Sequence, residues 1–242
     1  MKIGIVGYGM VGKAQEYLAK ELGHEVLVTD ITFSSDIDKD VSECDIVFIC
    51  TPERFIDEVI SHHIENDKGL LVIKSTVPIG TTKELMEKYK IHICHNPEFL
   101  REASWKVDVL RPNFIVIGQC CDKHGTLLLD FYKSLNVDIS RFITDPTTSE
   151  IVKLTLNAYL STLLMFWKSI KQLCDKFDVD ADSVAEIIAE DNRVSYYGYQ
   201  PITNKIGGRC LPKDLEHLVS AYNNIEPILF NAIKKVSDVH TI

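Results

Sequence analysis

The sequence predicts an α/β protein in which a doubly wound, mostly parallel sheet is followed by an all-helical domain. Two observations lead to this fold class. Short apolar runs alternate with helical patterns from Lys2 to Thr144, which is typical of parallel strands joined by helices. From Thr147 onward the pattern changes to helices alone, beginning with one long helix. We therefore expect a sheet domain over residues 1–146 and a helical domain over residues 147–242.

The first strand, Lys2 to Val6, runs directly into Gly7-Tyr8-Gly9-Met10-Val11-Gly12 and then into a helical pattern. This is the G-x-G-x-x-G pattern in the strand-turn-helix context that dinucleotide binding requires. Gly7 allows the tight turn, Gly9 allows a pyrophosphate to approach, and Gly12 allows the helix to pack on the strand. The phosphates then lie at the helix N-terminus, where backbone N–H groups favour an anion.

A second strand, Glu25 to Thr29, ends in Asp30, at about the twenty-residue offset at which dinucleotide-binding domains carry an acidic side chain. A carboxylate there binds the ribose hydroxyls of the adenosine and repels a 2′-phosphate. The cofactor predicted for this Rossmann-type domain is therefore NAD rather than NADP.

Three further apolar strands, 46–50, 70–73 and 91–94, each end in a polar stretch. Thr51 follows the first of them and Thr76 follows the second. Ligands bind at the carboxyl ends of the strands in open parallel sheets, so we expect both threonines at that edge. A plain turn is the alternative interpretation for Thr51.

The strand at 91–94 leads into Asn96-Pro97-Glu98-Phe99-Leu100-Arg101-Glu102. Glu98 and Glu102 are four residues apart, so in a helical turn they would share one face. That face is either a solvated surface or, because it follows a strand's carboxyl end, part of a site.

Two more strands, 113–118 and 141–144, flank a helix over 122–135 and complete the sheet. His92 and His95 stand near the fifth strand, but no spacing of His and Cys around them completes a metal site. We therefore expect ordinary structural roles for both histidines and no metal.

Hydroxyl side chains are expected to cap two helices. Thr81 or Thr82 would cap the helix after the fourth strand, and Thr147 or Ser149 would cap the long helix. The middle of that helix is apolar nearly all round, which a helix exposed to water on one side does not tolerate. We expect the helix over 149–175 to connect the domains and to form the core of a homodimer.

Lys153 and Asn157 are four residues apart on the long helix and share one face in apolar surroundings. Burying a lysine and an amide is costly unless each meets a partner, so their position favours a functional role. Structural pairing of the lysine with an acid is the alternative.

The stretch Gly207-Gly208-Arg209-Cys210-Leu211-Pro212-Lys213-Asp214 places a cysteine just before a predicted helix N-terminus. That position and its basic neighbours favour the thiolate, which makes Cys210 a candidate nucleophile. Asp214, one turn later, is near enough to orient or deprotonate a reacting group. The alternative is a buried structural cysteine.

Composition excludes several kinds of partner. The 242 residues carry a formal net charge of -9, which argues against nucleic acid or an anionic membrane surface as the main partner. No apolar run is long enough to suggest a membrane segment. Seven cysteines without a C-x-x-C pair, and a chain that opens directly into a strand, fit the reducing cytoplasm best.

Taken together, these stretches resemble the UDP-glucose/GDP-mannose dehydrogenase family over essentially the whole chain. The resemblance rests on five motifs: Gly7 to Gly12, Ser75-Thr76-Val77-Pro78, Asn96 to Glu102, Lys153 with Asn157, and Gly207 to Asp214. It implies that a nucleotide-sugar primary alcohol is oxidised to a carboxylate in two hydride transfers, with two NAD and no metal.

The resemblance also implies residue roles. Cys210 matches the family's nucleophile, which carries the aldehyde through a thiohemiacetal to a thioester. Lys153 and Asn157 match the groups that hold the developing oxyanion. Glu98 matches the carboxylate of thioester hydrolysis, and Asp214 with Thr76 matches a pair that positions water or a proton relay.

The remaining expected contacts divide into two sets. The expected cofactor contacts are Gly7, Gly9, Met10, Val11, Gly12, Asp30, Thr51, Thr76, Glu102 and Lys213. The expected substrate contacts are Glu98, Phe99, Leu100, Arg101, Glu102, Lys153, Asn157, Arg193, Tyr199, Thr203 and Gly207, with Arg193 reaching the site across the dimer.

Some features depart from the family pattern. Family members usually carry a second Rossmann-like domain after the helical region, which completes the nucleotide-sugar site, and these 242 residues do not include it. Lys205 stands where the family loop usually has a glycine, and the link from Asp30 to Val41 is shorter than the family's. Two alternatives therefore stay open: a catalytically silent binding protein, and a one-step hydroxyacid dehydrogenase.

Overall fold

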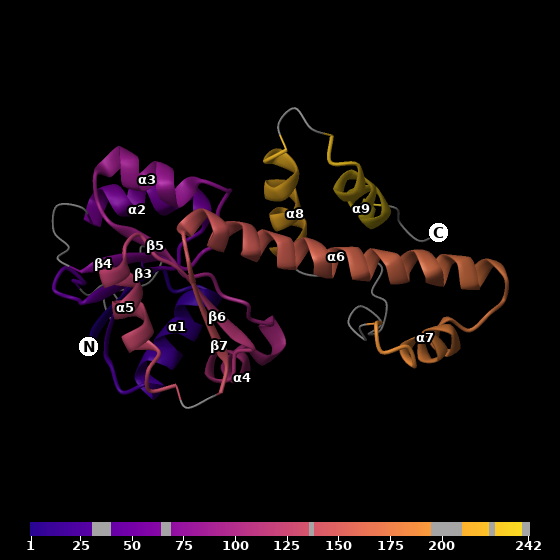
Figure 1. The fold of residues 1–242 in the computed structure, drawn as a ribbon, viewed down its shortest axis with the longest axis horizontal. Helices are drawn as coiled ribbons and strands as arrows, with labels where there is room; N and C mark the ends of the chain where they lie inside the picture. Colours follow the sequence, from indigo (N-terminus) through magenta and orange to yellow (C-terminus); the bar gives the residue numbers. More distant parts are fainter. Residues whose placement is uncertain (31–39, 64–68, 136–137, 195–209, 223–225, 239–242) are drawn as a thin grey trace. The chain divides into compact units, whose positions relative to one another are not determined.

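The structure is a computed structural model that describes residues 1–30, 40–63, 69–135, 138–194, 210–222 and 226–238 (Figure 1). The chain divides into two compact units, Met1–Lys153 and Leu154–Ile242. Within the described ranges, no helix has both the length and the apolar character required to cross a bilayer.

The first unit contains a seven-stranded sheet in the order β2-β1-β3-β4-β5-β6-β7. The pairs are parallel except for β5 and β6, which are antiparallel and are joined at one registered pair, His95 opposite Gly118. The strands are β1 (Lys2–Val6), β2 (Glu25–Thr29), β3 (Ile46–Ile49), β4 (Leu70–Ile73), β5 (Ile93–His95), β6 (Phe114–Gly118) and β7 (Ser140–Thr144). The predicted doubly wound, mostly parallel α/β sheet is confirmed.

Helices cover both faces of this sheet (Figure 1). The helical elements of the first unit are α1 (Met10–Glu21), η1 (Glu53–Phe55), α2 (Ile56–His63), α3 (Thr81–Tyr89), η2 (Glu102–Ser104), α4 (Trp105–Leu110) and α5 (Asp122–Phe131). Successive side chains of a strand point to opposite faces of the sheet, so the strands contribute to two hydrophobic cores, one on each face. On β3, Phe48 packs with residues of α1 and α5, while Val47 and Ile49 pack with residues of α2 and α3.

One long helix, α6 (Pro146–Lys176), begins in the first unit and continues into the second. The second unit also contains α7 (Ala181–Ala189), α8 (Cys210–Ser220) and α9 (Ile228–Asp238), so the predicted helical region is confirmed. Lys168 is buried and donates a hydrogen bond to the backbone oxygen of Val236 at 2.9 Å, which ties α6 to α9. Two aromatic side chains in the middle of α6, Tyr159 and Phe166, are 53% and 50% exposed.

The predicted caps of α3 and α6 are wrong. Helix α6 begins at Pro146, and Asp145 accepts the backbone N–H of Thr148 at 3.0 Å, so an aspartate precedes the helix where a threonine or serine was expected. At the start of α3 the capping position is Gly80, with a φ of 96°.

The acceptor for the first N–H groups of α3 comes from a distant helix. The carboxylate of Glu150 on α6 accepts hydrogen bonds from the backbone N–H of Gly80 at 2.6 Å and of Thr82 at 2.8 Å, and from the hydroxyl of Thr82 at 2.6 Å. Burial raises the pKa of Glu150. Thr82 is therefore a donor to the cap rather than the cap itself.

Candidate functional site

The glycine loop after β1 has the geometry that its sequence predicts. Gly7 has a φ of 93°, and a Cβ there would lie 2.9 Å from the backbone of Thr51. A Cβ on Gly12 would lie 2.0 Å from the carbonyl oxygen of Gly7, so the first turn of α1 can approach the strand only without a side chain. A Cβ on Gly9 would meet no atom within 4 Å, which leaves space beside the N-terminus of α1 for a pyrophosphate.

Asp30 lies at the end of β2, beside this loop. Its carboxylate accepts a hydrogen bond from the backbone N–H of Tyr8 at 2.5 Å. The contact fixes the middle of the glycine motif to the end of the neighbouring strand, at the position where the ribose hydroxyls of a dinucleotide bind.

Thr51 and Thr76 follow the carboxyl ends of β3 and β4, as expected. Ser75 donates its hydroxyl to the backbone oxygen of Thr51 at 2.6 Å, which ties the two strand ends together. The buried hydroxyl oxygen of Thr51 has no hydrogen-bond partner among the described residues. A buried polar atom without a partner is unusual in a protein, and its place beside the glycine loop is consistent with a hydrogen bond to a bound ligand.

Glu98 and Lys153 form a nearly buried ion pair. Their side chains are 12% and 5% exposed, and the Lys153 Nζ lies 3.2 Å from Glu98 Oε1. The other oxygen of Glu98 accepts the backbone N–H of Leu100 at 2.6 Å, and the Lys153 ammonium lies 5.2 Å from the centre of the Phe99 ring. Sequence analysis left open that Lys153 is paired with an acid for structural reasons. The acid that it meets is Glu98, the residue predicted to act in thioester hydrolysis.

The segment around Arg101 differs from its prediction. Glu98 precedes any helix, and Glu102 opens the short η2, so the two glutamates do not share a helical face. The guanidinium of Arg101 is exposed and is held by Asp108, with N–O distances of 2.6 and 3.0 Å. The hydrogen bonds from Arg101 lower the pKa of the Asp108 carboxyl to about 2.

Three buried residues to which sequence analysis gave no role meet near the carboxyl ends of β4 and β5. The ammonium of Lys74 and the hydroxyl of Tyr132 both donate to Asn96 Oδ1, at 3.0 and 2.5 Å. Burial lowers the pKa of Lys74 to about 8 and raises the pKa of Tyr132. The available signal was Lys74 itself, a lysine directly after an all-apolar strand.

His95 is wholly buried at the end of β5, and its Nδ1 lies 2.9 Å from the Ser149 hydroxyl on α6. Burial lowers the pKa of His95 to about 3, with smaller contributions from the charges of Lys74 and Lys153. The imidazole is therefore neutral at pH 7. The structural role predicted for this histidine agrees with these contacts.

The second unit contains a compact polar group of its own. The side-chain amide of Asn157 donates to the Asp214 carboxylate at 2.5 Å, and both residues are buried. Lys213 Nζ lies 3.6 Å from the other oxygen of Asp214. Cys210 is the first residue of α8, one turn before Asp214, and it is exposed rather than buried.

The remaining predicted substrate contacts either show no contact with these groups among the described residues or lie outside those residues. Arg193 is exposed, and its guanidinium pairs with Asp191 at 2.5 Å. Tyr199, Thr203, Lys205 and Gly207 lie outside the part of the chain that the structure describes.

The fold and the glycine loop define a dinucleotide-binding α/β protein with a helical second region. Residues 30–136 match the NAD-binding domain of the UDP-glucose/GDP-mannose dehydrogenase family, and residues 147–239 match the central domain of the same family. The chain belongs to this family, whose NAD-binding domain it carries.

Individual relatives agree with this family. The chain is 29% identical to UDP-glucose 6-dehydrogenase YwqF of Bacillus subtilis, covering 99% of this chain and 66% of the relative. It is 30% identical to UDP-glucose 6-dehydrogenase of Campylobacter jejuni, covering 99% of this chain and 72% of the relative. The solved structure of a UDP-glucose dehydrogenase from Pyrobaculum islandicum superposes with a TM-score of 0.87 at 25% identity, covering 98% of this chain and 68% of that one. The chain thus spans about two thirds of the length of each of these relatives.

Proposed function

We propose that the chain catalyses the NAD-dependent oxidation of a nucleotide sugar, UDP-glucose or a similar compound, from the primary alcohol to the carboxylate. Two NAD molecules, bound one after the other, would each accept one of the two hydrides that the carbon loses. The observation that carries the proposal is the exposed thiol of Cys210 at the first residue of α8, one turn from the buried Asn157–Asp214 pair, in a chain of this family.

The chemistry needs a nucleophile between the two oxidations. The alcohol carbon first loses a hydride and its hydroxyl group loses a proton, which gives an aldehyde. The Cys210 sulfur then adds to that carbon, and the thiohemiacetal loses a second hydride and a proton to become a thioester. Water cleaves the C–S bond, releasing the carboxylate and returning the thiol. The helix N-terminus at Cys210 favours the thiolate that the addition requires.

The polar residues predicted from the sequence would assist these steps. Lys153 and Asn157 would donate to the oxygen that becomes negative when the sulfur adds. Glu98 would take the proton of the attacking water, and its contact with Lys153 would hold the carboxylate in position for that step. Asp214 would orient the relay together with Thr76, and its contact with the Asn157 amide holds it in one position.

Cofactor and substrate contacts follow from the same proposal. The glycine loop would hold the NAD pyrophosphate, with further contacts from Asp30, Thr51, Thr76, Glu102 and Lys213. Phe99, Leu100, Arg101 and Arg193 would contact the substrate, together with the predicted residues that lie outside the described part of the chain.

The test is to supply the full chain with NAD and a panel of UDP- and GDP-sugars and to count NADH formed per sugar consumed. Two NADH per sugar with a carboxylate product are expected. One NADH per molecule oxidised would instead support the one-step hydroxyacid alternative, and NAD binding without turnover of any sugar would support a silent binding protein. Cys210→Ala should abolish the carboxylate product, and an unchanged yield would exclude Cys210 as the nucleophile.

We also propose that the chain forms a homodimer through α6. Tyr159, Phe166 and Leu173 recur at seven-residue intervals on this helix, and each is about half exposed, at 53%, 50% and 53%. Apolar side chains at that spacing form one stripe, which a second copy would cover. Sedimentation velocity tests this: Phe166→Glu should shift a dimer to monomer, whereas a wild-type chain that sediments as a monomer would refute it.

A further inference from the structure

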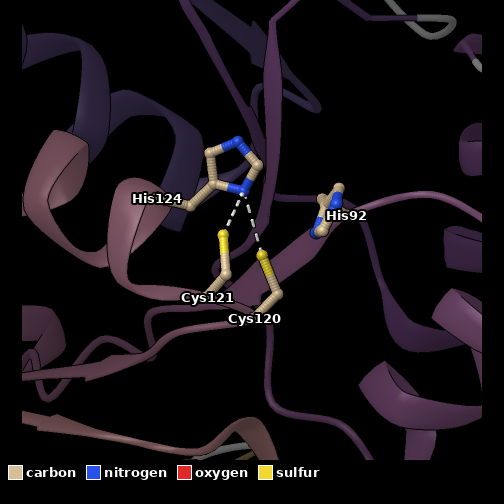
Figure 2. A group of neighbouring side chains, drawn as sticks. All are labelled: His92, Cys120, Cys121 and His124. Atoms are coloured by element: carbon tan, nitrogen blue, oxygen red, sulfur yellow. Dashed lines mark hydrogen bonds between the residues drawn. The ribbon is translucent and has the colours of Figure 1, made fainter.

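Four metal-ligating side chains converge in the first unit, away from the glycine loop. They are His92, Cys120, Cys121 and His124, and their ligand atoms all lie within 4.8 Å of one another. Figure 2 shows one ring nitrogen of His124 directed at both cysteine sulfurs, with His92 on the other side of Cys120. His92 is exposed and the other three are partly buried, so the group is accessible from solvent.

The antiparallel pairing of β5 and β6 brings the group together. His95 lies opposite Gly118, and continuing that register past the end of β6 runs the chain back along the start of β5, so that Cys121 comes alongside His92. Cys121 is also the capping residue of α5, and His124 lies in the first turn of that helix. The strand pairing and the start of α5 thus hold Cys120, Cys121 and His124 beside His92, although they are 28 to 32 positions later in the sequence.

The distances suit a tetrahedral site. His124 Nδ1 lies 3.1 Å from the sulfur of Cys120 and 3.4 Å from that of Cys121. In a tetrahedral zinc site with ordinary bond lengths, a sulfur and a nitrogen ligand are about 3.6 Å apart. The rings of His92 and His124 have centres 5.0 Å apart and planes at 71°, so they are not stacked and each can direct a nitrogen at a shared ion.

A disulfide is the competing use of these thiols. The sulfur of buried Cys94 lies 3.6 Å from that of Cys120, well beyond the length of about 2.05 Å of an S–S bond. A disulfide would leave the two imidazoles beside the sulfurs without a role. Two thiols and two imidazoles are, by contrast, the ligand set of a closed structural zinc site.

We propose that His92, Cys120, Cys121 and His124 bind one Zn²⁺ ion. Because β5 is parallel to β4, β3 and β1, the start of β5 lies at the opposite edge of the sheet from the glycine loop. The ion would therefore be structural rather than catalytic. It would link the start of β5 to the β6–α5 connection, across the place where the sheet has a single registered antiparallel pair.

The test uses the full chain, reduced, stripped with a chelator and then titrated with Zn²⁺ in competition with a chromophoric chelator. One equivalent is expected to bind. Co²⁺ in place of zinc should give the absorption bands of tetrahedral cobalt together with thiolate-to-cobalt charge transfer. At a free Zn²⁺ concentration of 100 times Kd, Tm should rise by roughly 5–10 °C.

Variants assign the site. Cys121→Ser places serine, a favourable capping residue, at the N-cap of α5, so the variant should still fold. Circular dichroism checks that it does. This variant and His124→Asn should each weaken Zn²⁺ binding more than about 100-fold, beyond the effect of a residue that only orients a ligand. His62→Asn, an exposed histidine at the end of α2, and Cys174→Ser are matched controls that should bind like wild type.

Three results would overturn the proposal. One is a reduced wild-type chain that takes up no zinc. Another is stoichiometric binding that survives unchanged in both Cys121→Ser and His124→Asn, which would be adventitious. The third is a Cys94–Cys120 disulfide in the native protein, found by mass spectrometry, with no zinc uptake after reduction.

Discussion

The two edges of the sheet collect chemically different side chains. At the carboxyl edge lie the glycine loop, Asp30, Thr51 and Glu98, each within three residues of the end of its own parallel strand. At the opposite edge, His92 precedes β5 while two cysteines follow β6, and these segments meet because β5 and β6 are antiparallel. Parallel strands place the loops that follow them at the same edge of the sheet. An antiparallel pair instead places the segment before one strand next to the segment after the other.

The largest effect is expected at the carboxyl edge. Lys153→Met leaves the Glu98 carboxylate nearly buried without its cation, which should cost about 3–5 kcal/mol of unfolding free energy. Adding Glu98→Gln should restore much of this loss, because the amide still accepts the Leu100 N–H. Urea unfolding measures both.

A matched control for that pair is the exposed ion pair of Lys171 and Asp175, with an N–O distance of 2.9 Å. Lys171→Met should change the free energy of unfolding far less than Lys153→Met does, because water and salt screen an exposed pair. Equal costs for the two lysine variants would show that burial does not distinguish the pairs.

The glycine loop gives the next largest effect. Gly12→Ala places a Cβ against the Gly7 carbonyl oxygen, so the free energy of unfolding should drop by about 1–3 kcal/mol. The same change should also weaken NAD binding. Gly9→Ala meets no protein atom, so NAD affinity should fall while stability changes by less than about 1 kcal/mol. Calorimetric titration with NAD separates the variants, and wild-type affinity in Gly9→Ala would place the pyrophosphate elsewhere.

His95 predicts a pH dependence. Its pKa is lowered to about 3 in the folded chain, so between pH 6.5 and 3 the unfolded chain binds a proton that the folded chain does not. The free energy of unfolding should therefore decrease as the pH is lowered from 6.5 to 3. His95 alone contributes up to about 1.4 kcal/mol per pH unit to this decrease. His95→Asn should flatten the slope relative to wild type in urea titrations, and parallel slopes would contradict the assignment.

The smallest effect tests the independence of the two edges. Cys121→Ser lies at the edge opposite the glycine loop, so NAD affinity should stay within about twofold of wild type, because distant sites are usually additive. A large loss of NAD binding in this variant, with or without zinc, would show that the edges are coupled.

The local part of the fold could be predicted from the sequence. Strands β1, β2 and β4 have the expected bounds, because each is a short apolar run beside a turn signal. The glycine loop and the start of α8 were also predictable, since both depend on residues adjacent in the chain.

Pairings over long sequence distances could not be predicted. Glu98 meets Lys153 across 55 residues, and Asn157 meets Asp214 across 57. A pattern shows that a buried lysine needs an acid, but only the packed structure selects which one. The metal-ligand cluster was missed for the same reason, because its first histidine is far from the cysteines in sequence and the antiparallel strand pair gives no local signal.

The cap that Glu150 gives α3 affects how the chain can be divided and in what order it folds. A fragment ending at residue 146 would leave the Gly80 and Thr82 N–H groups without their acceptor, whereas one ending at Lys153 would retain it. During synthesis, α3 leaves the ribosome almost 70 residues before the carboxylate that completes it. The first turn of α3 is therefore expected to become stable only after the start of α6 has emerged and docked.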